Sequence, residues 1–350
     1  MKLPKEYYAF SLYKHPFDNT INLVIQESAD VFYNINSYEQ GFIIHPFIET
    51  KSSPIILIKP DNIFRFHKRQ FKETKSFFQN ISFPEKEINL HTTTKQEYCD
   101  NVNNAKKAIQ EELFKKVVLS RVILKPQENK TELFIIVENL LEKYPNAFIC
   151  LSYHPLVGLW LCVTPELLLN KRNNLFSTYS LAGTQKYNNE EIRTIIWQKK
   201  EIEEQAYVTD YILEKINEIG GNQVKKSGPN NTLAGNVVHL KTEIEFELEA
   251  KTEEVLKQFH PTPAVCGMPK AEALEFINIH ESHNREYYTG YLGEINKEGN
   301  AILYVNLRCM QITNKQNIFY AGAGITIDSD DEKEWEETRR KAELLINMFE

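Results

Sequence analysis

Short apolar runs, rich in β-branched and aromatic residues, occupy the N-terminal part of the chain and are separated by Asn, Asp, Pro and Ser. They lie at residues 21–25, 41–48 and 55–58. Runs of this length between turn-forming residues are typical of strands and hairpins. The pattern therefore predicts a strand-rich segment over residues 1–95.

Helices and strands are mixed in the rest of the chain. Helical spacing of apolar positions predicts helices over residues 92–112, 132–143, 190–219, 252–259, 270–279 and 331–349. The helix over 92–112 should have a threonine cap, and the helix over 190–219 should end at Gly220 and Gly221. Strands are predicted over residues 116–124, 147–153, 158–163 and 237–246, with three more between 287 and 325. Because strict βαβ alternation is absent, the pattern favours an α+β fold with large antiparallel sheets. We see no linker or repeat and expect one domain over residues 1–350.

Composition and charge exclude several classes of protein. The chain is 42% hydrophobic and 25% charged, as in ordinary globular proteins, and its net charge of −7 has the wrong sign for a nucleic-acid-binding protein. Five cysteines without a C-x-x-C spacing exclude a zinc ribbon and a disulfide framework. The sequence has no signal-peptide h-region and no apolar stretch long enough to span a membrane. We expect a cytoplasmic protein with reduced thiols.

Common motifs of nucleotide, metal and hydrolase sites are missing or incomplete. There is no P-loop, and the single G-x-G at residues 322–324 lacks the third glycine of a dinucleotide fingerprint. His280 and His283 are three residues apart without a nearby third ligand, which favours surface histidines over a zinc site.

Three charged residues lie in segments whose other residues are apolar. Lys116 begins a strand, where it is either a snorkelling lysine or a base whose pKa burial lowers. Glu166, in the segment TPELLL, is most simply the first turn of a helix. Arg308 is the only charge in the strand predicted over residues 303–312, and a buried arginine requires an anionic partner.

Paired charges on two predicted helices also have two interpretations. Glu201 and Glu204 share a helical face, which is usually solvated, and Glu337 and Lys341 are spaced for an intrahelical ion pair. With the glycine-containing turn LAGT at 181–184, the same groups could bind a small polycarboxylate through Mg²⁺.

The order and the amino-acid sequences of these segments resemble those of the chorismate-utilising enzymes, the family of isochorismate, anthranilate, aminodeoxychorismate and salicylate synthases. The resemblance covers about residues 95–350 and is carried by KVVLSR (116–121), TPELL (164–168), LAGT (181–184), HPTPAVCG (260–267), REYYTG (285–290), RC (308–309), AGAGI (321–325) and EWEET (334–338). It implies one domain in which two large, mainly antiparallel sheets flank a cleft, with helices packed outside. The catalytic motifs would lie in residues 96–350, and residues 1–95 would complete one sheet.

The resemblance further implies a Mg²⁺-dependent site for chorismate, which carries a ring carboxylate and an enolpyruvyl carboxylate. Mg²⁺ held by Glu204 and Glu337 would bind the ring carboxylate, and Glu201 would support the metal through water. The backbone amides at Gly183 and Thr184 would bind the same carboxylate.

The enolpyruvyl carboxylate has its own set of implied residues. Arg308, Lys341 and the backbone at Gly322 would hold it, while His260 and Ala264 would line the pocket.

The implied reaction follows from two positions. In isochorismate and salicylate synthases, a lysine at the position of Lys116 activates water to attack C2, and a glutamate at that of Glu166 protonates the departing C4 hydroxyl. Anthranilate synthases usually have Gln instead of this lysine, and aminodeoxychorismate synthases have a nucleophilic lysine where this chain has Ala182. The resemblance therefore implies an isomerase that uses water, needs no glutamine amidotransferase subunit and acts as a monomer.

Both catalytic groups must be buried for this mechanism. A base must be neutral and an acid protonated near pH 7, whereas the reference pKa values are about 10.4 for lysine and about 4.3 for glutamate. Burial in a cleft shifts both pKa values in the required directions.

A further position separates isochorismate from salicylate as the product. Relatives that eliminate pyruvate tend to have Thr where this chain has Ala264, although its Tyr288 also occurs in salicylate synthases. The resemblance thus favours an isochorismate synthase serving menaquinone or siderophore biosynthesis. A salicylate synthase and a non-catalytic chorismate-binding protein remain alternatives.

Overall fold

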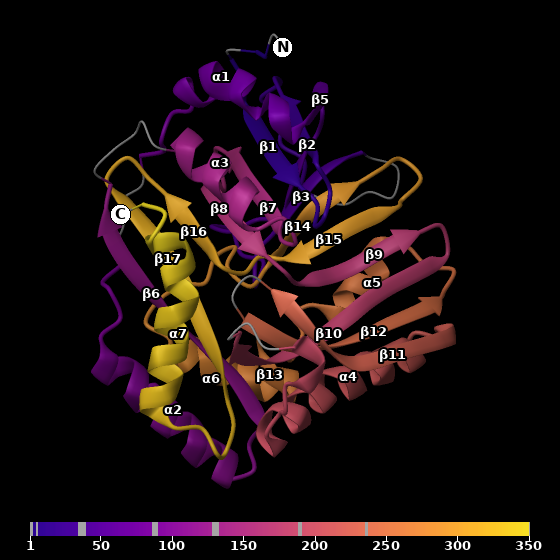
Figure 1. Ribbon diagram of the computed structural model, residues 1–350, viewed down its shortest axis with the longest axis vertical. Coiled ribbons are helices and arrows are strands. Elements are labelled where there is room, and N and C mark those ends of the chain that lie inside the picture. Colours follow the sequence, from indigo (N-terminus) through magenta and orange to yellow (C-terminus); the bar gives the residue numbers. More distant parts are fainter. Residues whose placement is uncertain are drawn as a thin grey trace.

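The computed structural model describes residues 3–4, 6–33, 40–85, 90–127, 133–187, 191–234 and 237–349, and the side chains at 182, 184, 186, 193, 200, 204, 234 and 237 lie outside this description. The described chain forms two antiparallel sheets with helices packed against them (Figure 1). The α+β class and the two sheets agree with the expectation from the sequence. No helix within the described ranges is long and apolar enough to cross a membrane.

The first sheet has nine strands among the described residues, in the order β13-β6-β17-β16-β8-β7-β1-β2-β5. They are β1 (Ala9–Lys14), β2 (Thr20–Gln26), β5 (Asn62–His67), β6 (Lys116–Pro126), β7 (Phe148–His154), β8 (Gly158–Thr164), β13 (Gly267–Met268), β16 (Cys309–Ile312) and β17 (Gln316–Ile325). The pairing of β6 with β17 sets Ser120 opposite Gly322. Two predicted site segments, KVVLSR and AGAGI, are thereby neighbours in this sheet.

The second sheet has eight strands in the same part of the chain, in the order β11-β12-β10-β9-β15-β14-β3-β4. They are β3 (Gly41–His45), β4 (Ile56–Ile58), β9 (Leu167–Arg172), β10 (Leu175–Lys186), β11 (Asn222–Ala234), β12 (Val237–Glu247), β14 (Tyr291–Ile295) and β15 (Ala301–Val305). Strand β10, which is paired with β9 and β12, contains the LAGT segment, so this segment is an irregular part of a strand, with a register shift between Ala182 and Gln185, rather than the predicted turn.

The N-terminal strands are divided between the two sheets. β1, β2 and β5 belong to the first sheet, whereas β3 and β4 extend the second. The expectation that residues 1–95 complete one sheet is therefore wrong. The side chains of β4 and of residues 41–44 in β3 are buried, and strands buried on both faces require a position in a sheet that is covered on both sides.

Seven α-helices and two 3₁₀ helices are described. They are η1 (Lys68–Thr74), α1 (Lys75–Gln79), α2 (Lys95–Gln110), α3 (Leu133–Lys143), η3 (Ile192–Thr194), α4 (Lys199–Glu218), α5 (Thr252–Phe259), α6 (Lys270–His280) and α7 (Asp331–Ile346). The predicted threonine cap is confirmed at α2, where Thr94 Oγ1 accepts from the Glu97 N–H at 3.2 Å and the Glu97 carboxylate accepts from the Thr94 N–H.

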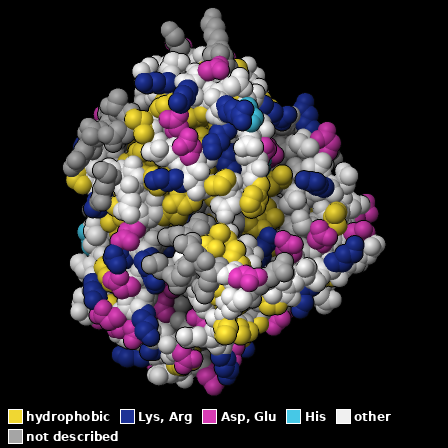
Figure 2. Space-filling model, in the orientation of Figure 1, with side chains coloured by type: hydrophobic (Ala, Val, Ile, Leu, Met, Phe, Trp, Pro, Cys, Tyr) yellow, Lys and Arg dark blue, Asp and Glu magenta, His cyan; other side chains and the backbone are white. Residues whose placement is uncertain are grey.

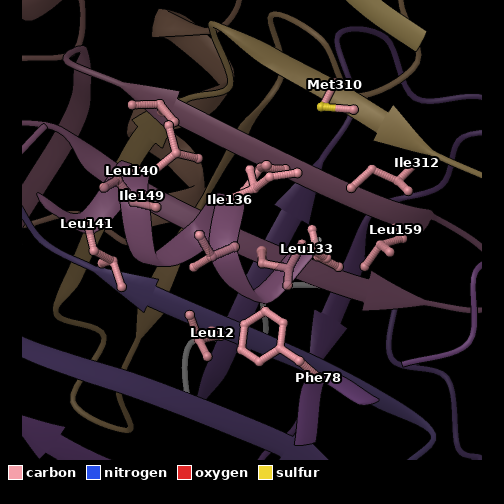
Figure 3. Close-up of a cluster of buried hydrophobic side chains, with 14 of the residues drawn as sticks. Leu12, Phe78, Leu133, Ile136, Leu140, Leu141, Ile149, Leu159, Met310 and Ile312 are labelled. Carbon is pink, nitrogen blue, oxygen red and sulfur yellow. The ribbon is translucent and has the colours of Figure 1, made fainter. Parts of the chain in front are cut away.

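One large apolar cluster lies between α3 and the first sheet (Figure 3). Ile136 and Leu140 of α3 face Ile149 of β7 and Leu159 of β8, and all four side chains are buried. Burial of such side chains contributes roughly 1.5–3 kcal/mol each. This cluster stabilises the sheet whose far strands, β6 and β17, carry predicted site residues.

Several local predictions differ from the structure. The long helix α4 begins at Lys199 rather than near residue 190, and the segment after Glu166 is the strand β9 rather than a helix. Four strands, rather than three, lie between residues 287 and 325. Arg308 lies in the connection between β15 and β16, not within a strand.

Charged side chains of both signs are interspersed over the face of the molecule shown in Figure 2. The five cysteines are buried and form no disulfide, which agrees with the expected reduced thiols.

Candidate active site

A cavity between the two sheets brings together most of the predicted site residues. Its walls come from β6 and β17 of the first sheet, from β10 and β12 of the second, and from α4 and α7. The predicted residues among its lining are Lys116, Glu166, Gly183, Glu201, Ala264, Arg308, Gly322, Glu337 and Lys341. The side chains of Thr184 and Glu204 lie outside the described residues.

Glu166 lies in the tight connection from β8 to β9. Its N–H donates to Thr164 Oγ1 at 3.2 Å, and its carbonyl accepts from the Val305 N–H at 3.0 Å. The side chain is 8% exposed, and burial raises its pKa to about 7 although Lys116, Lys341 and Arg308 act to lower it. A carboxylic acid with this pKa can donate a proton near neutral pH.

Lys116 begins β6 and is 1% exposed. Its backbone pairs with Met268 of β13, and a Cβ on the neighbouring Gly267 would come within 2.3 Å of the Lys116 carbonyl oxygen. Gly267, with φ of +150°, therefore permits the close strand contact that fixes the start of β6. The buried side chain lines the cavity that also contains Glu166.

Arg308 is held by a histidine that the sequence did not single out. Arg308 Nη2 lies 3.3 Å from His239 Nε2, and His239 Nδ1 lies 2.8 Å from the Gly183 carbonyl oxygen. Because a carbonyl only accepts, Nδ1 carries the proton and Nε2 accepts from the guanidinium. Burial, together with the charge of Arg308, lowers the pKa of His239 to about 3 and keeps the imidazole neutral.

Lys341 and Glu337 form the intrahelical ion pair that their spacing predicts, with Lys341 Nζ 2.7 Å from Glu337 Oε1. Lys341 Nζ also donates to the Gly322 carbonyl at 2.9 Å. A Cβ on Gly322 would come within 2.8 Å of the Tyr288 hydroxyl and 2.9 Å of the Leu119 carbonyl oxygen, so only glycine fits this close approach. Helix α7 is thus tied to the cavity wall by a charged group.

Glu201 supplies a carboxylate with an unpartnered oxygen. Glu201 Oε2 is buried and has no hydrogen-bond partner among the described residues, and both Glu201 and Glu337 line the cavity. Magnesium is commonly bound through one or two carboxylates, water and oxygens of the substrate, so these donors fit this ion. The described residues include no cluster of three or more His, Cys, Asp or Glu side chains that could hold a metal ion, and the third carboxylate predicted here is that of Glu204.

His260 lies behind the turn that carries Ala264, outside the described lining of the cavity. Its Nε2–H donates to the carbonyls of Pro46 and Phe47 at 3.2 and 3.1 Å, and its ring packs against His45 and Tyr291. Burial lowers its pKa to about 3, and the neighbouring His45 contributes to the shift. His260 therefore supports the turn that carries Ala264.

Aromatic residues form another part of the lining. The rings of Tyr288 and Tyr320 stack with centroids 5.4 Å apart, and burial raises the pKa of both hydroxyls, which stay neutral. Tyr320 and His239 were missed because each has apolar neighbours in its strand, IFYA in β17 and VVHL in β12, and a single aromatic or polar residue in such a run usually belongs to the core.

A family model described as chorismate binding enzyme matches residues 48–350. The isochorismate synthase EntC of Escherichia coli (strain K12) is 31% identical over 247 residues, which cover 67% of this chain and 62% of that protein. The chain thus spans about three fifths of the length of this curated relative.

Two solved structures share the fold. MenF, the menaquinone-specific isochorismate synthase from Escherichia coli, matches with a TM-score of 0.81 and 22% identity over 99% of this chain and 89% of that chain. Anthranilate synthase component I from Streptococcus pneumoniae TIGR4 matches with a TM-score of 0.71 and 17% identity over 100% of this chain and 93% of that chain. At these identities the likeness concerns the fold alone, so the choice among activities depends on the residues of the cavity.

Proposed function

The chain belongs to the chorismate-binding enzyme family, and from this premise we propose that it is an isochorismate synthase that adds water to C2 of chorismate and removes the C4 hydroxyl. One observation carries this choice: Lys116 and Glu166 line the same buried cavity, where the pKa of Glu166 is raised to about 7. The pair supplies a base for the incoming water and an acid for the departing hydroxide.

Lys116 is proposed to accept a proton from the water molecule as its oxygen bonds to C2. Glu166 donates a proton to the C4 oxygen as its bond to the ring breaks, and this oxygen leaves as water. One water molecule enters and one leaves, so the reaction is an isomerisation. Since water is the attacking group, no glutamine amidotransferase subunit is required, and we expect a monomer.

The cationic groups are proposed to orient the substrate. Arg308 and Lys341 bind the enolpyruvyl carboxylate with the backbone at Gly322, and the paired N–H groups of a guanidinium match the two oxygens of a carboxylate. The neutral His239 supports this role because it accepts a hydrogen bond from Arg308 without adding charge.

The ring carboxylate is assigned to the amides at Gly183 and Thr184. Glu204 and Glu337 would hold a Mg²⁺ ion, with Glu201 acting through water. When bound, the ion supplies positive charge that orients and neutralises the ring carboxylate. Glu201 Oε2, which is buried and has no hydrogen-bond partner among the described residues, supports this assignment.

A salicylate synthase is a second candidate, because Tyr288 also lines the cavity. Such an enzyme would make isochorismate and then release pyruvate. Ala264 favours the isochorismate synthase, whose product would serve menaquinone or siderophore biosynthesis.

Product analysis tests the proposal. Purified protein is incubated with chorismate and Mg²⁺, with an EDTA control, and isochorismate, salicylate, anthranilate and pyruvate are separated by chromatography. We expect metal-dependent isochorismate without pyruvate. Salicylate with pyruvate would transfer the assignment to the salicylate synthase, and chorismate binding without turnover would indicate a binding protein.

A further inference from the structure

A buried ion pair lies behind one wall of the cavity, outside the lining itself. Arg285 and Glu281 are both 2% exposed, and the guanidinium donates from Nε to Glu281 Oε2 at 2.8 Å and from Nη2 to Oε1 at 2.5 Å. The guanidinium also stacks over the ring of Phe47, 4.5 Å from its centroid. The arginine thus has one fixed orientation, with Nη1 and Nη2 free to donate further hydrogen bonds.

These remaining donors bind the backbone of two separate segments. Nη2 donates to the Val118 carbonyl at 2.6 Å, and Nη1 donates to the Val265 carbonyl at 2.8 Å and lies 3.5 Å from Thr289 Oγ1. The other partner, Glu281, accepts from the Ser120 N–H at 2.6 Å. Val118, Val265 and Thr289 all line the cavity, so the ion pair connects three of its lining segments.

The position of the guanidinium along β6 explains why it is needed there. β13 pairs with β6 at Lys116 and Val117, and the ladder extends to the bond from the Val118 N–H to the Cys266 carbonyl, 2.7 Å long. Beyond this point the carbonyls of Val118 and Val265 need another donor, because a buried carbonyl without one is destabilising. Arg285 supplies one N–H to each and so extends the connection between the two strands.

The hydrogen bonds from Arg285 to β6 affect the position of Lys116, because alternate residues of a strand share a face. Lys116 and Val118 lie on the same face of β6, and both line the cavity. The groups assigned to the substrate carboxylates belong to other elements, with Arg308 before β16 and Lys341 on α7. Movement of β6 would therefore displace the base relative to a substrate that is still held.

We propose that Arg285, fixed by Glu281, is a positioning residue that holds the base Lys116 and the lining at Val265 and Thr289 in register for water attack. This inference rests on the proposed function. Because a displacement of about 1 Å at a reacting group can cost 10²-fold in rate, loss of the connection should lower kcat rather than raise KM.

The test separates positioning from stability with three variants. Arg285→Lys keeps the charge but cannot bind Glu281 and two carbonyls together. The double variant Arg285→Met/Glu281→Leu removes both buried charges, so that no unpaired charge remains. For both we expect kcat lower by about 100-fold, KM for chorismate nearly unchanged, and faster hydrogen exchange of the amides at residues 116–120 and 265–268.

Lys14→Met is the matched control. Lys14 is a buried cation, 1% exposed, whose Nζ donates to the carbonyls of His15 and Pro145 at 2.8 and 3.0 Å, and none of these residues lines the cavity. We expect a lower Tm with unchanged kcat and unchanged exchange at residues 116–120.

The outcomes distinguish this inference from the proposed function. If the double variant has the wild-type Tm and also the wild-type kcat, Arg285 has no positioning role. If Lys14→Met lowers kcat as much as Arg285→Lys does, the effect is one of stability, and the inference is again overturned. If the wild-type protein makes no isochorismate, the proposed function fails, whatever the exchange of β6 shows.

Discussion

Glu166 keeps its proton up to a pH at which an exposed glutamate is ionised, because burial outweighs the three nearby cations that act on its pKa. The local pattern indicated this residue only as a charge beside an apolar segment, most simply in the first turn of a helix, and its role as the acid was implied by the family resemblance alone. Its burial depends on β9, which begins at Leu167, and on Tyr179, whose hydroxyl binds the Pro165 carbonyl and the Leu167 N–H. These contacts are distant in sequence, so the pattern around Glu166 could not reveal them.

The raised pKa of Glu166 has a consequence for stability. The folded protein binds a proton more tightly than the unfolded chain, so the free energy of unfolding decreases as the pH rises from about 4.5 to about 7. This group should contribute a decrease of about 3 kcal/mol, which Glu166→Gln should abolish. Urea unfolding of both proteins at pH 5 and pH 8 measures the difference. Equal pH dependence in the two proteins would show that Glu166 is not protonated in the fold.

The proposed role of Lys116 as the base can be tested by a single substitution. Lys116→Ala should lower kcat by roughly 10²- to 10⁴-fold, the contribution typical of a general base. Lys125→Ala, at an exposed position of the same strand, is the matched control and should leave kcat unchanged. Initial rates of chorismate consumption measure both. Wild-type turnover by Lys116→Ala would exclude this lysine as the base.

Elements with regular apolar spacing were predicted well, and those held by backbone pairing alone were not. α2, α3 and β6 lie within three residues of their predicted ends, because each has a buried stripe or run. β11 is a polar, largely exposed edge strand paired to β12, so its side chains contain no signal of the strand. Helix α4 begins only at Lys199, and Glu201 in its first turn lines the cavity.

Helix α4 allows a direct test of the metal assignment. Glu201 lines the cavity, whereas Glu203 is exposed and pairs with Lys199 at 3.4 Å. Glu201→Gln should weaken Mg²⁺ binding by roughly 10- to 100-fold, as expected for a residue that supports a metal ligand, and Glu203→Gln should not weaken it. The rise of Tm with Mg²⁺ concentration measures binding without turnover. Identical titrations for both variants would remove Glu201 from the metal site.

At the scale of the whole molecule, the cavity exists because two sheets face each other and each contributes part of its wall. Lys116 and Gly322 come from the first sheet, and Gly183 and His239 come from the second. The sequence predicted the α+β class and most of these residues through the resemblance of its motifs. It did not predict that β3 and β4 join the second sheet, because an apolar strand is compatible with either sheet until its partner is known.

The measurement that tests the central claim most directly is turnover of chorismate in ¹⁸O-labelled water under initial-rate conditions, with the product analysed by mass spectrometry. Attack by water at C2 predicts isochorismate that carries one ¹⁸O atom, in the new C2 hydroxyl. Unlabelled isochorismate, or no isochorismate in the presence of Mg²⁺, would contradict the account.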